Sequence, residues 1–128
     1  MSVKAYQKAA AQAESPRETE YRAFAHATRG LLAVAKRDRF DPAQLLPLME
    51  ALDLNRRLWS ALAIDCGDSN NQLPIGLRAQ IISLAIWVGK HSSLVARGQG
   101  DIGDLIDVNR AIMQGLSPHS TGSTDALE

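Results

Sequence analysis

The chain has 128 residues, and its lysines and arginines balance its aspartates and glutamates at 14 each. This length fits one ordinary domain, which buries roughly two thirds of its unfolded surface around a single core, and it leaves no room for a second. The zero net charge provides no overall electrostatic attraction to nucleic acid, anionic membranes or acidic substrates, although a local charged patch is compatible with it.

The first forty residues carry start signals for helices. Val3–Ala13 is rich in alanine, but so short a helix is marginal unless it docks, so residues 1–14 are expected either to dock or to be mobile. Ser15, Pro16 and Glu18 form a capping box with proline at the first helical position, which predicts a helix from about residue 16 to residue 37. Its apolar face comprises Tyr21, Phe24, Ala25, Thr28, Leu31, Leu32 and Ala35.

A second start signal lies at Asp41, which is followed by Pro42 and then, three residues after the aspartate, by a glutamine. Pro47 falls beyond the first turn of a helix that begins there, so we expect a short lead-in turn and a main helix over about residues 47–65. Gly67 is expected to end that helix in the left-handed conformation. The predicted core stripe comprises Leu48, Leu52, Asn55, Trp59, Leu62 and Ala63.

The most apolar part of the chain follows Pro74, which marks the next helix start. Its wide apolar face comprises Leu77, Ile81, Leu84, Ala85 and Val88, with Ile82, Ile86 and Trp87 at the margins. A helix that is apolar around much of its circumference is either the central helix of a bundle or one that meets a partner. The glycines at positions 98 and 100 are expected to end it.

The last predicted helix begins after Asp101, an N-cap residue, and ends near Gly115 and Pro118. Its stripe comprises Ile102, Leu105, Ile106, Asn109, Ile112, Met113 and Leu116. Residues 117–128 form a polar tail that is expected to be disordered. Because no useful stretch alternates with period two, the sequence predicts an all-α, compact single-domain bundle of about five helices within residues 1–116.

The search for catalytic, cofactor and metal motifs finds no convincing set. Gly98, Gly100 and Gly103 spell the dinucleotide fingerprint GxGxxG, but that motif acts only after a strand, and here a helix is expected before it. The three histidines are scattered, and Cys66 has no histidine or basic residue beside it in the sequence. We therefore expect no enzymatic activity, metal or cofactor. The single cysteine and the lack of an apolar signal core or a ~20-residue apolar span predict a soluble cytoplasmic protein.

The remaining candidates are interaction residues, and each has two interpretations. Asn55 and Asn109 lie within apolar stripes, where an amide either fixes the register of a bundle or anchors a partner's helix in a groove. Trp59 and Trp87 fit either the core or a partner-facing anchor, because tryptophan is enriched at binding hot spots. The arginines of the predicted second helix fit a solvated face better than an RNA-binding one, since acidic residues are interleaved with them.

Three segments resemble the FlaF family of bacterial flagellar regulators in their order and spacing: ALDLNRRLWSALAID, LPIGLRAQIISLAIWVGKHS and LIDVNRAIMQGL. The likeness covers about residues 3–116. It implies an all-helical cytoplasmic protein that binds flagellin, supports its export, and works with the companion regulator FlbT to couple flagellin synthesis to filament assembly. The positions that match the family pattern are Asn55, Arg56, Leu58, Trp59, Asp65, Leu73, Pro74, Arg78, Trp87, Asn109 and Gly115.

The leading hypothesis is therefore a non-enzymatic, flagellin-binding secretion chaperone and regulator. Its binding surface is expected on the wide apolar face of residues 77–95, which suits an amphipathic helical segment of flagellin. The predicted partner-binding residues are Asn55, Arg56, Trp59, Arg78, Leu77, Ile81, Leu84, Trp87 and Asn109. The alternative is a post-transcriptional regulator that contacts flagellin mRNA directly through the Arg-rich second helix, with a steep salt dependence.

Overall fold

The computed structural model of the protein describes residues 16–116, which contain four α-helices and one short 3-10 helix and no strand. These elements are α2 (Pro16–Ala35), η1 (Pro42–Gln44), α3 (Leu45–Gly67), α4 (Ile75–Ala96) and α5 (Ile102–Leu116). The all-α prediction is confirmed. The helix expected at 3–13, which contributed to the count of about five, and the tail at 117–128 lie outside the described residues. Within the described part, no helix is both long enough and apolar enough to cross a bilayer.

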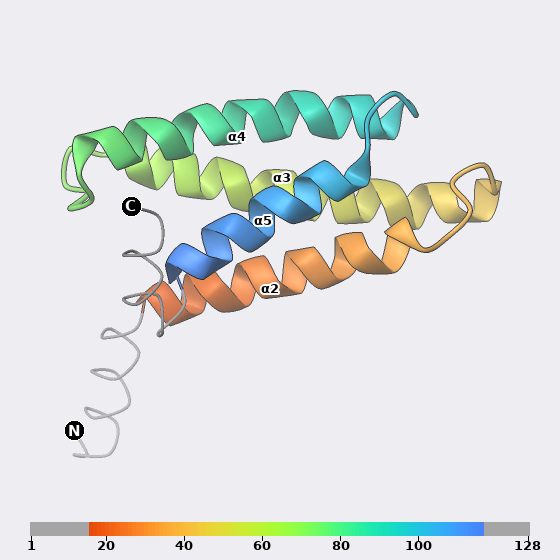
Figure 1. Cartoon of the computed structure of the whole chain (residues 1–128), viewed down its shortest axis with the longest axis horizontal. Helices are drawn as coiled ribbons and strands as arrows, with labels where there is room; N and C mark the ends of the chain where they lie inside the picture. The colour runs from red at the N-terminus through yellow and green to blue at the C-terminus, as the bar shows by residue number, and fades with distance from the viewer. Residues whose placement is uncertain (1–15, 117–128) are drawn as a thin grey trace, which may run out of the picture.

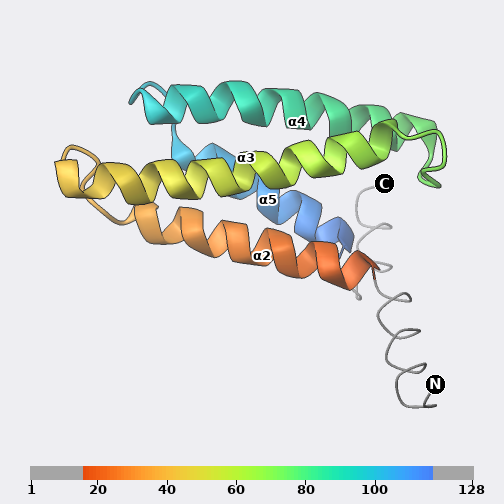
Figure 2. The ribbon, with the colours of Figure 1, turned by 180° about the vertical axis from the view of Figure 1, so that it is seen from behind.

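The helices form a bundle around α3 (Figure 1). α3 is antiparallel to both of its neighbours in sequence, α2 and α4, and packs along each of them. α5 lies obliquely across one face of α3, beginning beside the end of α4 and ending beside the start of α2, and the reverse view shows α3 in front of it (Figure 2). Because α5 packs mainly on α2, the side of α4 that faces away from α3 is left largely uncovered.

Two of the predicted N-terminal caps are confirmed. At the start of η1 the Asp41 carboxylate accepts a hydrogen bond from the Ala43 N–H at 3.0 Å, and at the start of α5 the Asp101 carboxylate accepts one from the Gly103 N–H at 2.8 Å. Both bonds satisfy N–H groups that the first turn of a helix leaves without an intrahelical partner. The predicted start of α4 after Pro74 is also confirmed.

One prediction about α3 is displaced by two residues, and another is wrong. The predicted short lead-in turn is η1, but the main helix begins at Leu45 rather than Pro47, so Pro47 lies within its first turn, where the missing N–H removes no hydrogen bond. Gly67 is the last helical residue and has no positive φ, and Asp68 then leaves the helix in an extended conformation with φ −72°. Within the described part of the chain, the positive φ belongs to Gly98, at 79°, in the turn between α4 and α5.

The core is one cluster of apolar side chains to which every long helix contributes. Five of the six residues of the predicted core stripe of α3 are buried, namely Leu48, Leu52, Asn55, Trp59 and Leu62. Ala63 is only partly buried, and Cys66, which the stripe did not include, is buried instead. Trp59 is the largest fully buried side chain, and its ring meets that of Phe24 of α2 edge to face, with ring centroids 5.3 Å apart. This arrangement sets the positive edge of one ring against the negative face of the other, which stabilises the contact beyond simple burial.

One carboxylate lies in an unfavourable position between α2 and α3. Glu20 is half-buried, and this burial, together with the nearby charge of Asp65, raises the pKa of Glu20 above its ordinary value of 4.5. Ionised Glu20 is therefore less favourable in the folded protein than in the unfolded chain. The stability linked to this group is fully present below pH 4.5 and is lost as the pH rises through the folded-state pKa.

Glu20→Gln is expected to raise the free energy of unfolding at neutral pH, because the amide keeps the shape of the side chain without the charge that burial disfavours. The gain should disappear below pH 4.5, where the glutamate is protonated in both states. Urea unfolding at the two pH values measures both effects. Glu18→Gln, which replaces an exposed acid in the first turn of the same helix, is the control and should give no gain. An equal gain for Glu20→Gln at both pH values contradicts this account.

Candidate functional site

The residues predicted to bind a partner separate into three groups in the structure. The core group, with at most 4% of each residue exposed, is Asn55, Trp59, Ile81 and Asn109. The group that bonds α3 to α4 or to the turn between them is Arg56 and Arg78. The group on the surface of α4 is Leu77, Leu84 and Trp87. The structure thus places both asparagines and Trp59 inside the bundle, which agrees with the core interpretation of each.

A buried hydrogen-bond network centred on Asn109 joins three helices. The Asn109 amide of α5 accepts a hydrogen bond from the Trp59 indole N–H at 2.8 Å and donates one to Asn55 Oδ1 at 2.7 Å, so it bonds twice to α3. It also donates to the Thr28 hydroxyl of α2 at 3.1 Å. That hydroxyl donates in turn to the Phe24 carbonyl at 2.6 Å. Asn109 therefore sets the position of α5 against both α2 and α3.

The indole of Trp59 decides how both buried amides are oriented. An indole N–H is only a donor, so Asn109 presents its oxygen to Trp59 and its NH2 group to its other two partners. Asn55 must then present its own oxygen, which leaves Asn55 Nδ2 buried with no hydrogen-bond partner among residues 16–116. An unpaired buried donor costs about 1–3 kcal/mol. The network is therefore complete at Asn109 and incomplete at Asn55.

The two arginines that were predicted to bind a partner form hydrogen bonds within the hairpin of α3 and α4. Arg56 of α3 donates to Ser93 Oγ of α4 at 3.0 Å. Arg78 of α4 donates from Nε to the Cys66 carbonyl at 2.7 Å and from a terminal nitrogen to the Asp68 carbonyl at 3.0 Å. Carbonyls at a helix C-terminus lack intrahelical hydrogen-bond donors, and Arg78 supplies donors to the carbonyls at the end of α3. These bonds clamp the hairpin near its middle and at its turn.

The exposed side of α4 carries no charge over about three helical turns. Residues 79–89 include no Asp, Glu, Lys, Arg or His. The exposed side chains in this stretch, named here the uncharged face of α4, are Ala79, Gln80, Ser83, Leu84 and Ile86. The first four line a shallow, open depression of the surface, and Ile86 is 56% exposed. Because the centres of protein interfaces are depleted of charged residues, this uncharged face is the candidate interaction surface of α4.

Trp87 lies at one edge of the uncharged face of α4. It is half-buried and stacks on His91, with ring centroids 4.7 Å apart and an angle of 12° between the ring planes. His91 Nε2 lies 2.8 Å from the Asp101 carbonyl and 3.3 Å from the Asp104 carboxylate, so the histidine connects α4 to the start of α5. Trp87 is thereby held at the border between the core and solvent.

Among the described residues, neither a metal-binding group nor an activated thiol is present. None of their His, Cys, Asp and Glu side chains form a group that could hold a metal ion. Burial raises the pKa of the Cys66 thiol, Asp65 and Glu20 act in the same direction, and Arg78 opposes them. A protonated thiol is a poor nucleophile. The GxGxxG sequence at 98–103 follows α4 rather than a strand, so it lacks the context of a phosphate-binding turn.

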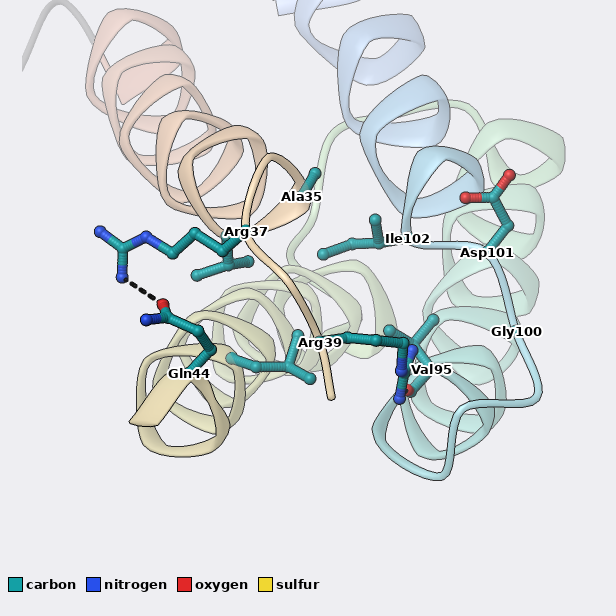
Figure 3. A pocket seen from close by; sticks show the side chains of 10 residues that line it. Ala35, Arg37, Arg39, Gln44, Val95, Gly100, Asp101 and Ile102 are labelled. Carbon is teal, nitrogen blue, oxygen red and sulfur yellow. Dashed lines mark hydrogen bonds between the residues drawn. The ribbon is translucent and has the colours of Figure 1, made fainter. Parts of the chain in front are cut away.

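A pocket that the sequence did not predict lies at one end of the bundle (Figure 3). It has a volume of about 200 Å³ and lies where the ends of α2 and α4 meet the starts of α3 and α5. Its lining residues are Val34, Ala35, Arg37, Arg39, Gln44, Leu48, Val95, Gly100, Asp101 and Ile102. These residues come from segments far apart in the chain, so no local sequence pattern predicts the pocket.

Asn109→Ala is expected to destabilise the protein more than Asn55→Ala, although both substitutions truncate the same buried side chain. Asn109→Ala leaves the Trp59 N–H without its acceptor and opens a cavity, at a cost of about 3 kcal/mol. Asn55→Ala also removes an unpaired donor, which offsets part of the loss and leaves about 1–2 kcal/mol. Urea unfolding of the two variants measures the difference. Equal losses, or a larger loss for Asn55→Ala, contradict the assigned network.

Comparison with protein-family models matches residues 2–116 to the family described as flagellar protein FlaF. No curated protein and no solved structure matches the chain. The family match spans the whole described bundle, including the Asn109 network and the uncharged face of α4. It also agrees with the resemblance carried by the three sequence segments. The chain therefore belongs to the FlaF family of flagellar proteins.

Proposed function

We propose that this FlaF-family protein is a non-enzymatic secretion chaperone and regulator, which binds flagellin and couples flagellin synthesis to filament assembly. Family membership makes it a flagellar protein. The observation that carries the binding function is the uncharged face of α4. In this proposal the regulator FlbT acts as a companion, either through direct contact or in the same regulatory circuit. The FlaF-family protein acts in the cytoplasm, before flagellin is exported.

An amphipathic helix of flagellin suits the uncharged face of α4 for two physical reasons. Leu84 and Ile86 are exposed, and removing apolar surface from water favours association by about 25 cal/mol per Å² before the costs of association are subtracted. Residues 79–89 carry no charge, so no ionised group of this stretch has to be desolvated when a partner covers it. The cores of known interfaces are depleted of charged residues in the same way.

The buried motif residues support this surface indirectly. Through Asn109, the network holds α5 against α2 and α3, and α5 therefore runs away from the outer side of α4 (Figure 1). Arg56 and Arg78 hold α4 to α3, so the exposed helix is presented on a fixed support. In this proposal the uncharged face of α4 makes the direct contacts with flagellin, and the core residues hold that helix in place.

Leu84→Glu and Ile86→Glu are each expected to abolish co-elution with flagellin. A carboxylate buried without a partner at an apolar interface costs about 2 kcal/mol or more, which is roughly a thirtyfold loss of affinity. Wild-type protein and each variant are co-expressed with flagellin and compared by size-exclusion chromatography at micromolar concentration. Both side chains are exposed in the free protein, so the circular-dichroism melting curve should be unchanged.

Leu54→Glu is the matched control, because Leu54 is 41% exposed against 37% for Leu84 but belongs to α3. This variant should co-elute with flagellin as the wild type does. If wild-type protein and flagellin elute separately, the proposed function is wrong; if Leu54→Glu fails as well, the assigned surface is wrong. Direct contact with flagellin mRNA, the alternative, requires an RNA mobility shift that salt and the substitutions Arg22→Gln and Arg29→Gln weaken.

A further inference from the structure

The pocket at the end of the bundle combines an apolar floor with a cationic rim (Figure 3). The aliphatic side chains of its floor are Val34, Leu48, Val95 and Ile102. The rim carries the guanidinium groups of Arg37 and Arg39, which belong to the loop between α2 and η1 and lie on different sides of the pocket. The pocket is therefore apolar at its base and positively charged at its edge.

Both guanidinium groups are held in place by the chain itself. Arg39 donates from a terminal nitrogen to the Val95 carbonyl at 3.0 Å, and Arg37 donates to Gln44 Oε1 at 3.2 Å. The turn at Gly98 passes so close that a Cβ there would lie 3.1 Å from the Arg39 guanidinium. Neither arginine forms an ion pair with any residue in the described part of the chain. Their charges are therefore positioned and are not neutralised by an ion pair, although Asp38 and Asp41 lie in the same loop and the Arg39 guanidinium lies 5.9 Å from the centre of the Phe40 ring.

The acidic residue of the lining does not neutralise this rim. The Asp101 carboxylate accepts the hydrogen bond from the Gly103 N–H at 2.8 Å, and in Figure 3 it points away from Arg39. Its charge is thus directed toward the start of α5. The N–H groups of Arg39 that do not reach the Val95 carbonyl stay available as donors at the pocket edge.

We propose that this pocket binds an aliphatic residue that carries a free carboxylate, namely the C-terminal residue of a partner polypeptide. The volume of about 200 Å³ suits one branched aliphatic side chain, since an aliphatic cavity of about 150 Å³ holds a benzene-sized ligand. The side chain lies on the floor, and the carboxylate accepts charge-assisted hydrogen bonds from Arg39 at the rim.

The surroundings of the pocket favour a polypeptide over a free acid. Phe40 is 86% exposed, Leu45 54% and Leu46 67%, and these residues adjoin Arg39 and Gln44 in the sequence. The residues that precede the C-terminus of a bound chain would cover these exposed apolar side chains beside the pocket, whereas a small acid would leave them in water. The site is separate from the uncharged face of α4, and its test does not involve flagellin.

The test is an NMR titration of the isotope-labelled full chain with the peptide acetyl-Ala-Ala-Leu, prepared with a free carboxylate or with a C-terminal amide. The free-carboxylate peptide should shift the amide signals of Gly98, Gly100 and Ile102. The amidated peptide should bind about tenfold more weakly, because it cannot accept charge-assisted hydrogen bonds. Arg39→Gln should lower the affinity for the free-carboxylate peptide to the same extent, and it should leave the affinity for the amidated peptide unchanged.

Two further variants extend the test. Gly98→Ala should also weaken binding of the free-carboxylate peptide, because its Cβ displaces the Arg39 guanidinium and the positive φ at this position strains the turn that carries it. Arg57→Gln, which removes an exposed guanidinium paired with Asp53 at 3.0 Å on α3, should bind as the wild type does. Equal affinity for the two peptides, or no shift with either, overturns the proposal. N-acetyl-leucine that binds as tightly as the peptide, or inorganic phosphate that binds in its place, overturns the polypeptide assignment.

Discussion

The bundle depends on one amide, that of Asn109, through which α2, α3 and α5 are joined inside the core. In an apolar interior a hydrogen bond is strong and an unpaired polar group is costly. Shifting α5 along α3 would separate Asn109 from the donor-only indole of Trp59 and leave several buried groups unpaired. The network therefore specifies the register of the helices, as polar residues do in the seams of coiled coils.

The surfaces of the protein follow from this constraint. Because α5 packs mainly on α2 and meets only the end of α4, the side of residues 79–89 that faces away from α3 stays in water. The same arrangement brings the ends of four helices together and encloses the pocket beside Arg39. The molecule thus presents two regions of different chemistry, one apolar and uncharged, the other apolar at its base and cationic at its edge.

Local signals predicted the helices well. Asp41 and Asp101 act as caps, and the apolar spacing of α3 matches its buried residues, because capping and periodicity act over a few residues. The lead-in turn before α3 was predicted as well, but η1 continues directly into α3, with Gln44 already in the helical conformation, so α3 begins two residues before Pro47. The pocket had no comparable signal, since Arg39 reaches Val95 across 56 positions of the sequence.

The sequence by itself determined the helical class, most helix boundaries and the family, because these are carried by local periodicity, caps and the order of short segments. It also marked Asn55, Trp59 and Asn109 as unusual residues on apolar stripes. Only the tertiary structure decided that these three lie in the core while Leu84 and Ile86 lie in solvent. The physical reason is that the burial of a side chain depends on which helices pack together. An apolar stripe in the sequence does not specify which neighbouring helix covers it.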